Sequence, residues 1–78
     1  MPTVNTIPIA IYRKALEKMG LEKMPSSGGG HEKWTRADLS RPVMFSAHYK
    51  EIPSMQVRTN CRTLGISIHV FMKLVNSL

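Results

Sequence analysis

The sequence predicts an α+β domain of two layers, in which helices lie on one face of a three-stranded antiparallel sheet. Three observations support this fold class. Apolar residues recur at helical spacing towards both ends of the chain, and they alternate with polar residues between these regions. Clusters of Gly, Pro, Ser and Asp separate the segments, as is typical of turns. With 78 residues, the chain is predicted to form a single domain, residues 1–78.

Three helices are predicted from apolar spacing and from residues that favour helix ends. The first covers residues 7–19, where apolar side chains recur every three or four positions. The second covers residues 54–64, and a short third helix follows it near the C-terminus. Serine favours the N-cap of a helix, and glycine favours the left-handed conformation that ends one. The predicted cap residues are Ser54 and Ser67 at N-termini, and Gly20 and Gly65 at C-termini.

Three strands are predicted between the first two helices. They cover residues 21–24, 31–37 and 41–47, with turns between them. Trp34, at the centre of the second strand, is expected in the core rather than on a base-stacking surface. This strand carries polar residues on both faces, so its sequence does not decide which face is buried.

The charge of the chain points to a polyanionic partner. Eleven Lys and Arg residues against five Asp and Glu residues give a net charge of +6. No acid follows Ile52, whereas three basic residues do. A basic domain attracts polyanions, of which nucleic acid is the most common in the cytosol. The alternative is that the basic composition serves solubility alone.

The chain is expected to act in the cytoplasm and to have no membrane partner. Its single cysteine, Cys61, excludes an internal disulfide, which fits a reducing compartment. The longest apolar run is far shorter than the roughly 20 residues that span a bilayer. The first residues lack the charged and apolar regions of a signal peptide.

His31 is the candidate for acid–base chemistry. It follows three glycines and opens a strand, so its imidazole is expected to be exposed beside a loop whose backbone N–H groups approach phosphate closely. An imidazole takes up and releases protons near neutral pH. The alternative is a surface histidine beside an ordinary turn. The accompanying candidates for phosphate binding are Gly29, Gly30 and Lys33.

Three further basic side chains are candidates for RNA contacts. His48 ends the third strand, either as a phosphate contact or as a solvated turn residue. Arg58 and Arg62 lie four residues apart on one helix face, where they either clamp phosphate or are simply solvated. No His or Cys spacing matches a zinc site, and the glycine run lacks the Lys of a nucleotide-binding loop. Neither a metal nor a cofactor is therefore expected.

Taken in order, the segments of this chain resemble the HicA family of toxin–antitoxin mRNA interferases. The match covers most of the chain, from about Ala10 to Leu74. Gly30 stands where that family usually has Ser, immediately before the signature histidine. The segments that carry the resemblance are Ala-Leu-Glu-Lys-Met-Gly-Leu at 15–21, Gly-Gly-His-Glu-Lys-Trp at 29–34, residues 41–53, and Leu-Gly-Ile-Ser at 64–67 with the helix before it.

This resemblance implies a fold, an activity and a partner. The fold is similar to the double-stranded-RNA-binding domain, α-β-β-β-α, here with an extra short C-terminal helix. The implied activity is metal-independent endonucleolytic cleavage of mRNA, with His31 as the catalytic acid or base. The implied partner is a HicB-type antitoxin protein. Two alternatives remain: a non-catalytic RNA-binding module of the same fold, and a small interaction protein that meets an acidic protein only.

Overall fold

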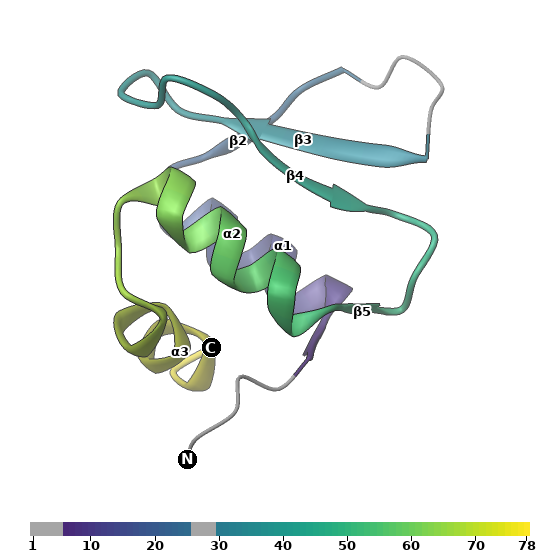
Figure 1. Ribbon diagram of the computed structural model, residues 1–78, viewed down its shortest axis with the longest axis vertical. Helices are drawn as coiled ribbons and strands as arrows, with labels where there is room; N and C mark the ends of the chain where they lie inside the picture. Colours follow the sequence, from purple (N-terminus) through teal and green to yellow (C-terminus); the bar gives the residue numbers. More distant parts are fainter. Residues whose placement is uncertain (1–5, 26–29) are drawn as a thin grey trace.

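The computed structural model describes residues 6–25 and 30–78. It confirms the predicted α+β class, because a three-stranded antiparallel sheet lies on one side of the helices (Figure 1). Within the described ranges, no helix has the length and hydropathy that crossing a bilayer requires. In chain order the elements are β1 (Ile7–Pro8), α1 (Ile9–Lys18), β2 (Glu22–Lys23), β3 (His31–Thr35), β4 (Val43–Ser46), β5 (Glu51–Ile52), α2 (Ser54–Leu64) and α3 (Ile68–Asn76).

The main sheet has the order β2-β3-β4, with β3 at its centre. Trp34 pairs with Val43 across β3 and β4, and both side chains are buried. His31 and Lys33 alternate with the buried positions and are exposed. The structure thus decides what the sequence leaves open: the face of β3 that carries Trp34 is buried, and the face that carries His31 is open. The predicted core position of Trp34 is confirmed.

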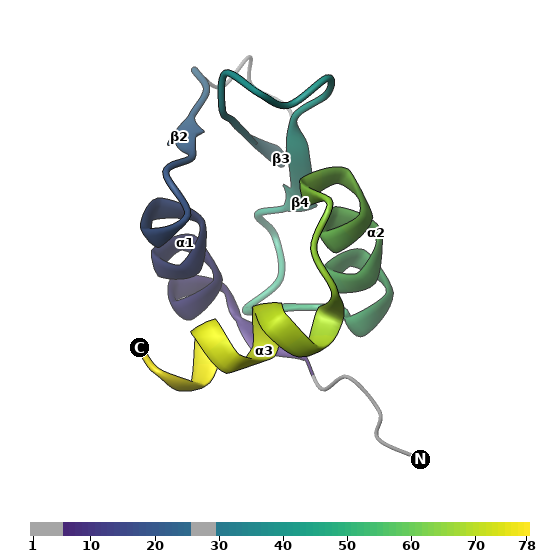
Figure 2. The ribbon, with the colours of Figure 1, turned by 90° about the vertical axis from the view of Figure 1, so that its left-hand side faces the viewer.

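Aromatic rings join the layers of the core. The ring of Tyr12 in α1 meets that of Phe45 in β4 edge-on, with centroids 5.2 Å apart, and that of Phe71 in α3 at 5.6 Å. The buried amide of Asn60 in α2 donates to the hydroxyl of Tyr12 and to the backbone carbonyl of Met44, both at 2.9 Å. Helices α1 and α2 therefore pack between the sheet and α3, as Figure 2 shows.

Three of the four predicted caps are confirmed. Gly20 and Gly65 adopt left-handed conformations, with φ of 84° and 74°. The hydroxyl of Ser67 accepts a hydrogen bond from the backbone N–H of Val70. The prediction of Ser54 as an N-cap is wrong, because Pro53 occupies the cap position in an extended conformation and no side chain caps the helix. Ser54 is therefore the first residue inside α2.

A second, two-stranded sheet was not predicted. Ile7 in β1 pairs with Ile52 in β5, and the N–H of Ile9 donates to the carbonyl of Lys50 at 2.9 Å. Because residues 7 and 8 belong to this strand pair, α1 begins two residues later than predicted. The strands of the main sheet are also shorter than predicted, by two or three residues each. The small sheet anchors the segment that leads from β4 to α2, which carries part of the site described next.

Candidate functional site

His31 and Ser46 face each other across the open side of the sheet. They are paired positions at one end of β3 and β4. The N–H of Ala47 donates to the carbonyl of Gly30 at 2.8 Å, which makes that neighbouring pair hydrogen-bonded. His31 and Ser46 therefore form a non-hydrogen-bonded pair, in which Cα atoms lie about 4.5 Å apart and side chains approach most closely. The imidazole of His31 is exposed and has a hydroxyl group as its neighbour.

The imidazole of His48 rests on the backbone of Gly30. An ideal Cβ built on Gly30 would lie less than 3.0 Å from three ring atoms of His48, the farthest of them Cε1 at 2.9 Å. Only glycine fits beneath this ring without displacing it. Since a carbon–carbon bond spans about 1.5 Å and adjacent Cα atoms about 3.8 Å, the ring atoms lie within about 8 Å of the Cα of His31.

A turn of the chain after β4 brings His48 to Gly30. Its N–H donates to the hydroxyl of Ser46, at 3.3 Å, so the chain folds back immediately after β4. The hydroxyl of Ser46 accepts this bond and keeps its own proton to donate. At this end of the sheet His31 and Ser46 are paired positions, and the ring of His48 lies against Gly30, the residue before His31.

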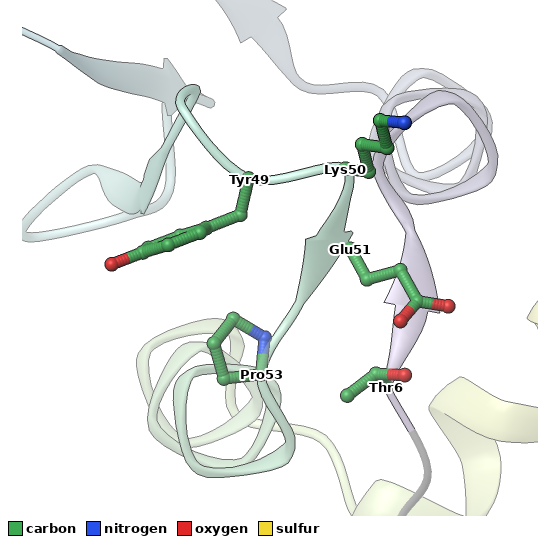
Figure 3. A pocket seen from close by; sticks show the side chains of 5 residues that line it. All are labelled: Thr6, Tyr49, Lys50, Glu51 and Pro53. Atoms are coloured by element: carbon green, nitrogen blue, oxygen red, sulfur yellow. The ribbon is translucent and has the colours of Figure 1, made fainter.

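Tyr49, which follows His48 in the chain, carries an exposed aromatic ring. Its side chain is 61% exposed and borders a hollow of about 390 Å³. Figure 3 shows the ring of Tyr49 and the carboxylate of Glu51 on opposite sides of β5, with Pro53 below the ring. An exposed ring is a stacking surface for an unpaired base, and a carboxylate accepts hydrogen bonds from the amino groups of bases. The remaining lining residues are Thr6 and Lys50.

Beneath His31, an ion pair fixes β3 to α1. The guanidinium of Arg13 donates two hydrogen bonds to the carboxylate of Glu32, at 2.7 and 3.0 Å. The indole N–H of Trp34 donates to the same carboxylate at 2.8 Å. Glu32 is only 5% exposed, and the bonds from Arg13 hold the pKa of its carboxyl below the usual value. This contact holds the residue next to His31 in place.

The predicted phosphate-binding residues lie at different places. Lys33 is exposed on the face of β3 that carries His31, whereas Gly29 lies outside the described residues. Arg62 lies near the C-terminal end of α2, which Figure 1 places at the opposite end of the sheet from the start of β3. Arg58 is exposed on α2, one turn before Arg62. The structure therefore separates Arg62 from His31.

Two residues of this end of the sheet were missed by sequence reasoning. Ser46 falls within the strand predicted over residues 41–47, and Tyr49 lies just beyond it, and the sequence alone points to no role for either. The register of β3 against β4 was the signal that would have placed Ser46 opposite His31. For residues 6–25 and 30–78, no group of three or more His, Cys, Asp or Glu side chains is placed to hold a metal ion.

Comparisons with models of protein families, with curated proteins and with solved structures give no match to this chain.

Proposed function

We propose that this chain is an endoribonuclease that cleaves single-stranded RNA without a metal, at the end of the sheet that carries His31. The observation that supports this most is the exposed imidazole of His31 at the position paired with Ser46, with a second imidazole, that of His48, against the preceding residue Gly30. Two imidazoles are the side chains best suited to move two protons at neutral pH. The net charge of +6 favours the approach of a polyanion such as RNA.

The proposed reaction uses the ribose 2′-hydroxyl as nucleophile. Its oxygen bonds to the adjacent phosphorus while the bond from phosphorus to the 5′-oxygen breaks. A base takes the proton of the 2′-hydroxyl, and an acid gives one to the leaving 5′-oxygen. The products are a 2′,3′-cyclic phosphate and a 5′-hydroxyl end. His31 serves as one of these two groups, and His48 is the candidate for the other.

The neighbouring residues supply binding and charge. The hydroxyl of Ser46 is free to donate to a phosphate oxygen, and Lys33 brings a positive charge to the same open face. The ring of Tyr49 offers a stacking surface for a base next to the cleaved bond. Stacking on Tyr49 requires RNA that is unpaired, so that the base can leave its neighbours.

The motif resemblance supports the same proposal and extends it to a biological role. A HicA-like chain would cleave mRNA in the cytoplasm as a toxin, and a HicB-type antitoxin would silence it. Such a partner is expected to cover His31 and the basic surface around it with acidic groups, because charge complementarity speeds and orients binding. The exposed Lys33, on the same face of β3 as His31, would meet those acids.

The decisive experiment compares the chain with two histidine variants. Unstructured RNA is incubated in EDTA with the parent chain, with His31→Ala and with His69→Ala, and the product ends are identified. His69 is an exposed histidine of α3 and controls for the loss of any imidazole. We expect His31→Ala to lower the rate at least about a hundredfold, since acid–base groups contribute about 10²–10⁴. His69→Ala is expected to cleave like the parent.

Two results would overturn the proposal. Cleavage that survives in His31→Ala would remove His31 from the chemistry. Products with 5′-phosphate ends, or a strict need for Mg²⁺, would exclude attack by the 2′-hydroxyl. If no variant cleaves but all bind RNA with a steep dependence on salt, the chain is instead a non-catalytic RNA-binding module.

A further inference from the structure

A second basic site lies at the other end of the sheet. The connection from β3 to β4 and the last turns of α2 enclose a hollow of about 430 Å³, here called the arginine hollow. Figure 1 shows this connection above the C-terminal end of α2, away from the start of β3. The hollow is lined by Ser40, Arg41, Thr59, Arg62 and Thr63, two guanidinium groups and three hydroxyl groups without a carboxylate.

Neither arginine of the hollow is neutralised by an acid of the described chain. The ion pairs formed among residues 6–25 and 30–78 are Arg13 with Glu32 and Arg36 with Asp38. Asp38 is the acid nearest to Arg41 in the sequence, and Arg36 occupies both of its carboxylate oxygens. The hydrogen bonds from Arg36 also hold the pKa of Asp38 below its usual value. The positive charge of the hollow is therefore available to an external anion.

The chemistry of the hollow selects phosphate among anions. Guanidinium groups bind phosphate oxygens through paired N–H donors, and hydroxyl groups add single donors. The hydroxyl of Thr63 is held only weakly by its own helix, with 3.4 Å to the carbonyl of Thr59, so it can turn towards a ligand. No aromatic side chain lines the hollow, so it offers nothing for a base to stack on. Contacts of this kind read the backbone of a nucleic acid and not its sequence.

We infer that the arginine hollow binds a backbone phosphate of the same RNA strand that His31 cleaves. This inference rests on the proposed function and deepens it. Arg41 lies two residues before β4, and the chain from Arg41 to Ser46 spans at most about 17 Å at 3.3 Å per residue. That length equals about five nucleotides of one strand at a spacing of about 3.4 Å. The bound strand thus follows β4 from the cleaved phosphate to the arginine hollow, and the hollow favours substrates long enough to reach it.

Binding of RNA that resists cleavage tests the inference separately from catalysis. Fluorescence anisotropy measures the affinity for a twelve-nucleotide and a three-nucleotide RNA whose 2′-hydroxyls are all methylated. We expect Arg41→Gln and Arg62→Gln each to weaken binding of the long RNA about tenfold, the effect of losing one charged hydrogen-bonded contact. Each should also lower the slope of log affinity against log salt by about one. The short RNA, which does not reach the hollow, is expected to bind all variants equally.

Two further variants distinguish the loss of a specific contact in the arginine hollow from the loss of positive charge in general. Lys73→Gln removes one positive charge from an exposed position of α3 and should leave both affinities near those of the parent. Arg41→Lys keeps the charge but loses the paired donors, and an affinity between those of parent and Arg41→Gln would support phosphate binding. Both arginines are exposed, so the variants are expected to unfold at the temperature of the parent.

Each outcome of this test is distinct from the outcome for catalysis. Equal binding of the long RNA by the parent and both Gln variants overturns the inference, even if His31 proves to be catalytic, and leaves the hollow to an acidic protein. An equal loss in Lys73→Gln also overturns it, because the effect is then one of overall charge. If the two Gln variants lose affinity for the long RNA and Lys73→Gln does not, the result supports the hollow as an RNA site even if the chain fails to cleave.

Discussion

Substitution of Gly30 by alanine isolates the contact between this residue and His48. The φ angle of Gly30 lies outside the left-handed region, which among the described glycines only Gly20 and Gly65 adopt. Its backbone conformation is therefore open to alanine, and the added methyl group meets nothing closer than the imidazole of His48. The substitution consequently changes the position of the His48 imidazole without adding backbone strain.

The structure predicts a small effect on stability and a large effect on cleavage. Replacing glycine in a compatible conformation stabilises a protein by about 0.4–1 kcal/mol through the unfolded state. Moving the exposed ring of His48 off its rotamer costs about 0.5–1.5 kcal/mol, so the free energy of unfolding should change by less than about 1 kcal/mol. Cleavage should fall at least about tenfold, since a positioned proton-transfer group contributes about 10²–10⁴ to the rate.

A double-mutant cycle measures whether the loss acts through His48. Single-turnover cleavage is compared for the parent, Gly30→Ala, His48→Ala and the double variant. Once the ring is absent, the methyl group at position 30 has nothing to displace, so the double variant is expected to cleave at the rate of His48→Ala. The pH–rate profile should also lose one of its two limbs in His48→Ala, which a merely structural role would not cause.

Two results would refute this reasoning. Cleavage by Gly30→Ala at the parent rate would show that the position of the His48 imidazole against Gly30 does not affect the reaction. A slowing by the same factor with and without the imidazole of His48 would show that alanine acts on the site by another route.

The remaining predictions concern stability and are measured by denaturant unfolding. Glu32→Gln should lower the free energy of unfolding at neutral pH by about 1–3 kcal/mol, because the bonds from Arg13 and Trp34 to a buried carboxylate are weakened. The folded-state pKa of Glu32 is lowered, so this stabilisation is present above about pH 4 and is lost on acidification. The free energies of unfolding of the parent and Glu32→Gln should therefore converge at low pH. A difference between them that stays constant with pH would contradict the assignment. Ser67→Ala should cost about 0.5–2 kcal/mol through loss of the α3 cap, whereas Ser54→Ala should cost clearly less, and equal losses would show that the cap bond is not the cause.

The helices were predictable because their signals are local. Apolar spacing and glycine positions fix α1 and α2 within two residues of their observed bounds, and the left-handed conformation of Gly20 follows from its place after the helix. The β1–β5 pair was not predictable in this way. It joins Ile7 to Ile52 through two residues on each side, too short a segment for any alternation to show.

The buried face of β3 was left open for a similar reason. Glu32 is a charged residue on the side that the core covers, which contradicts the usual pattern of apolar residues inside. Its burial is tolerated because Arg13, nineteen positions earlier, supplies the opposite charge from another element. Periodicity within β3 contains no information about that partner. Arg62 was predicted as a phosphate contact beside Arg58, but its partner Arg41 was not, since only the packing of the β3–β4 connection on α2 joins the two.

In the HicA family, which the motifs of this chain resemble, a serine usually stands at the position of Gly30. The structure gives the same residue a different meaning, because the absence of a side chain at position 30 is what admits the ring of His48. A serine there would carry a Cβ into that ring, so the serine and the seated imidazole exclude each other. Ser46 meanwhile places a hydroxyl group opposite His31 from the neighbouring strand. We therefore expect Gly30→Ser to displace His48 as alanine does and to cleave RNA more slowly than the parent. Cleavage at or above the parent rate would instead show that a serine hydroxyl at position 30 can replace the imidazole.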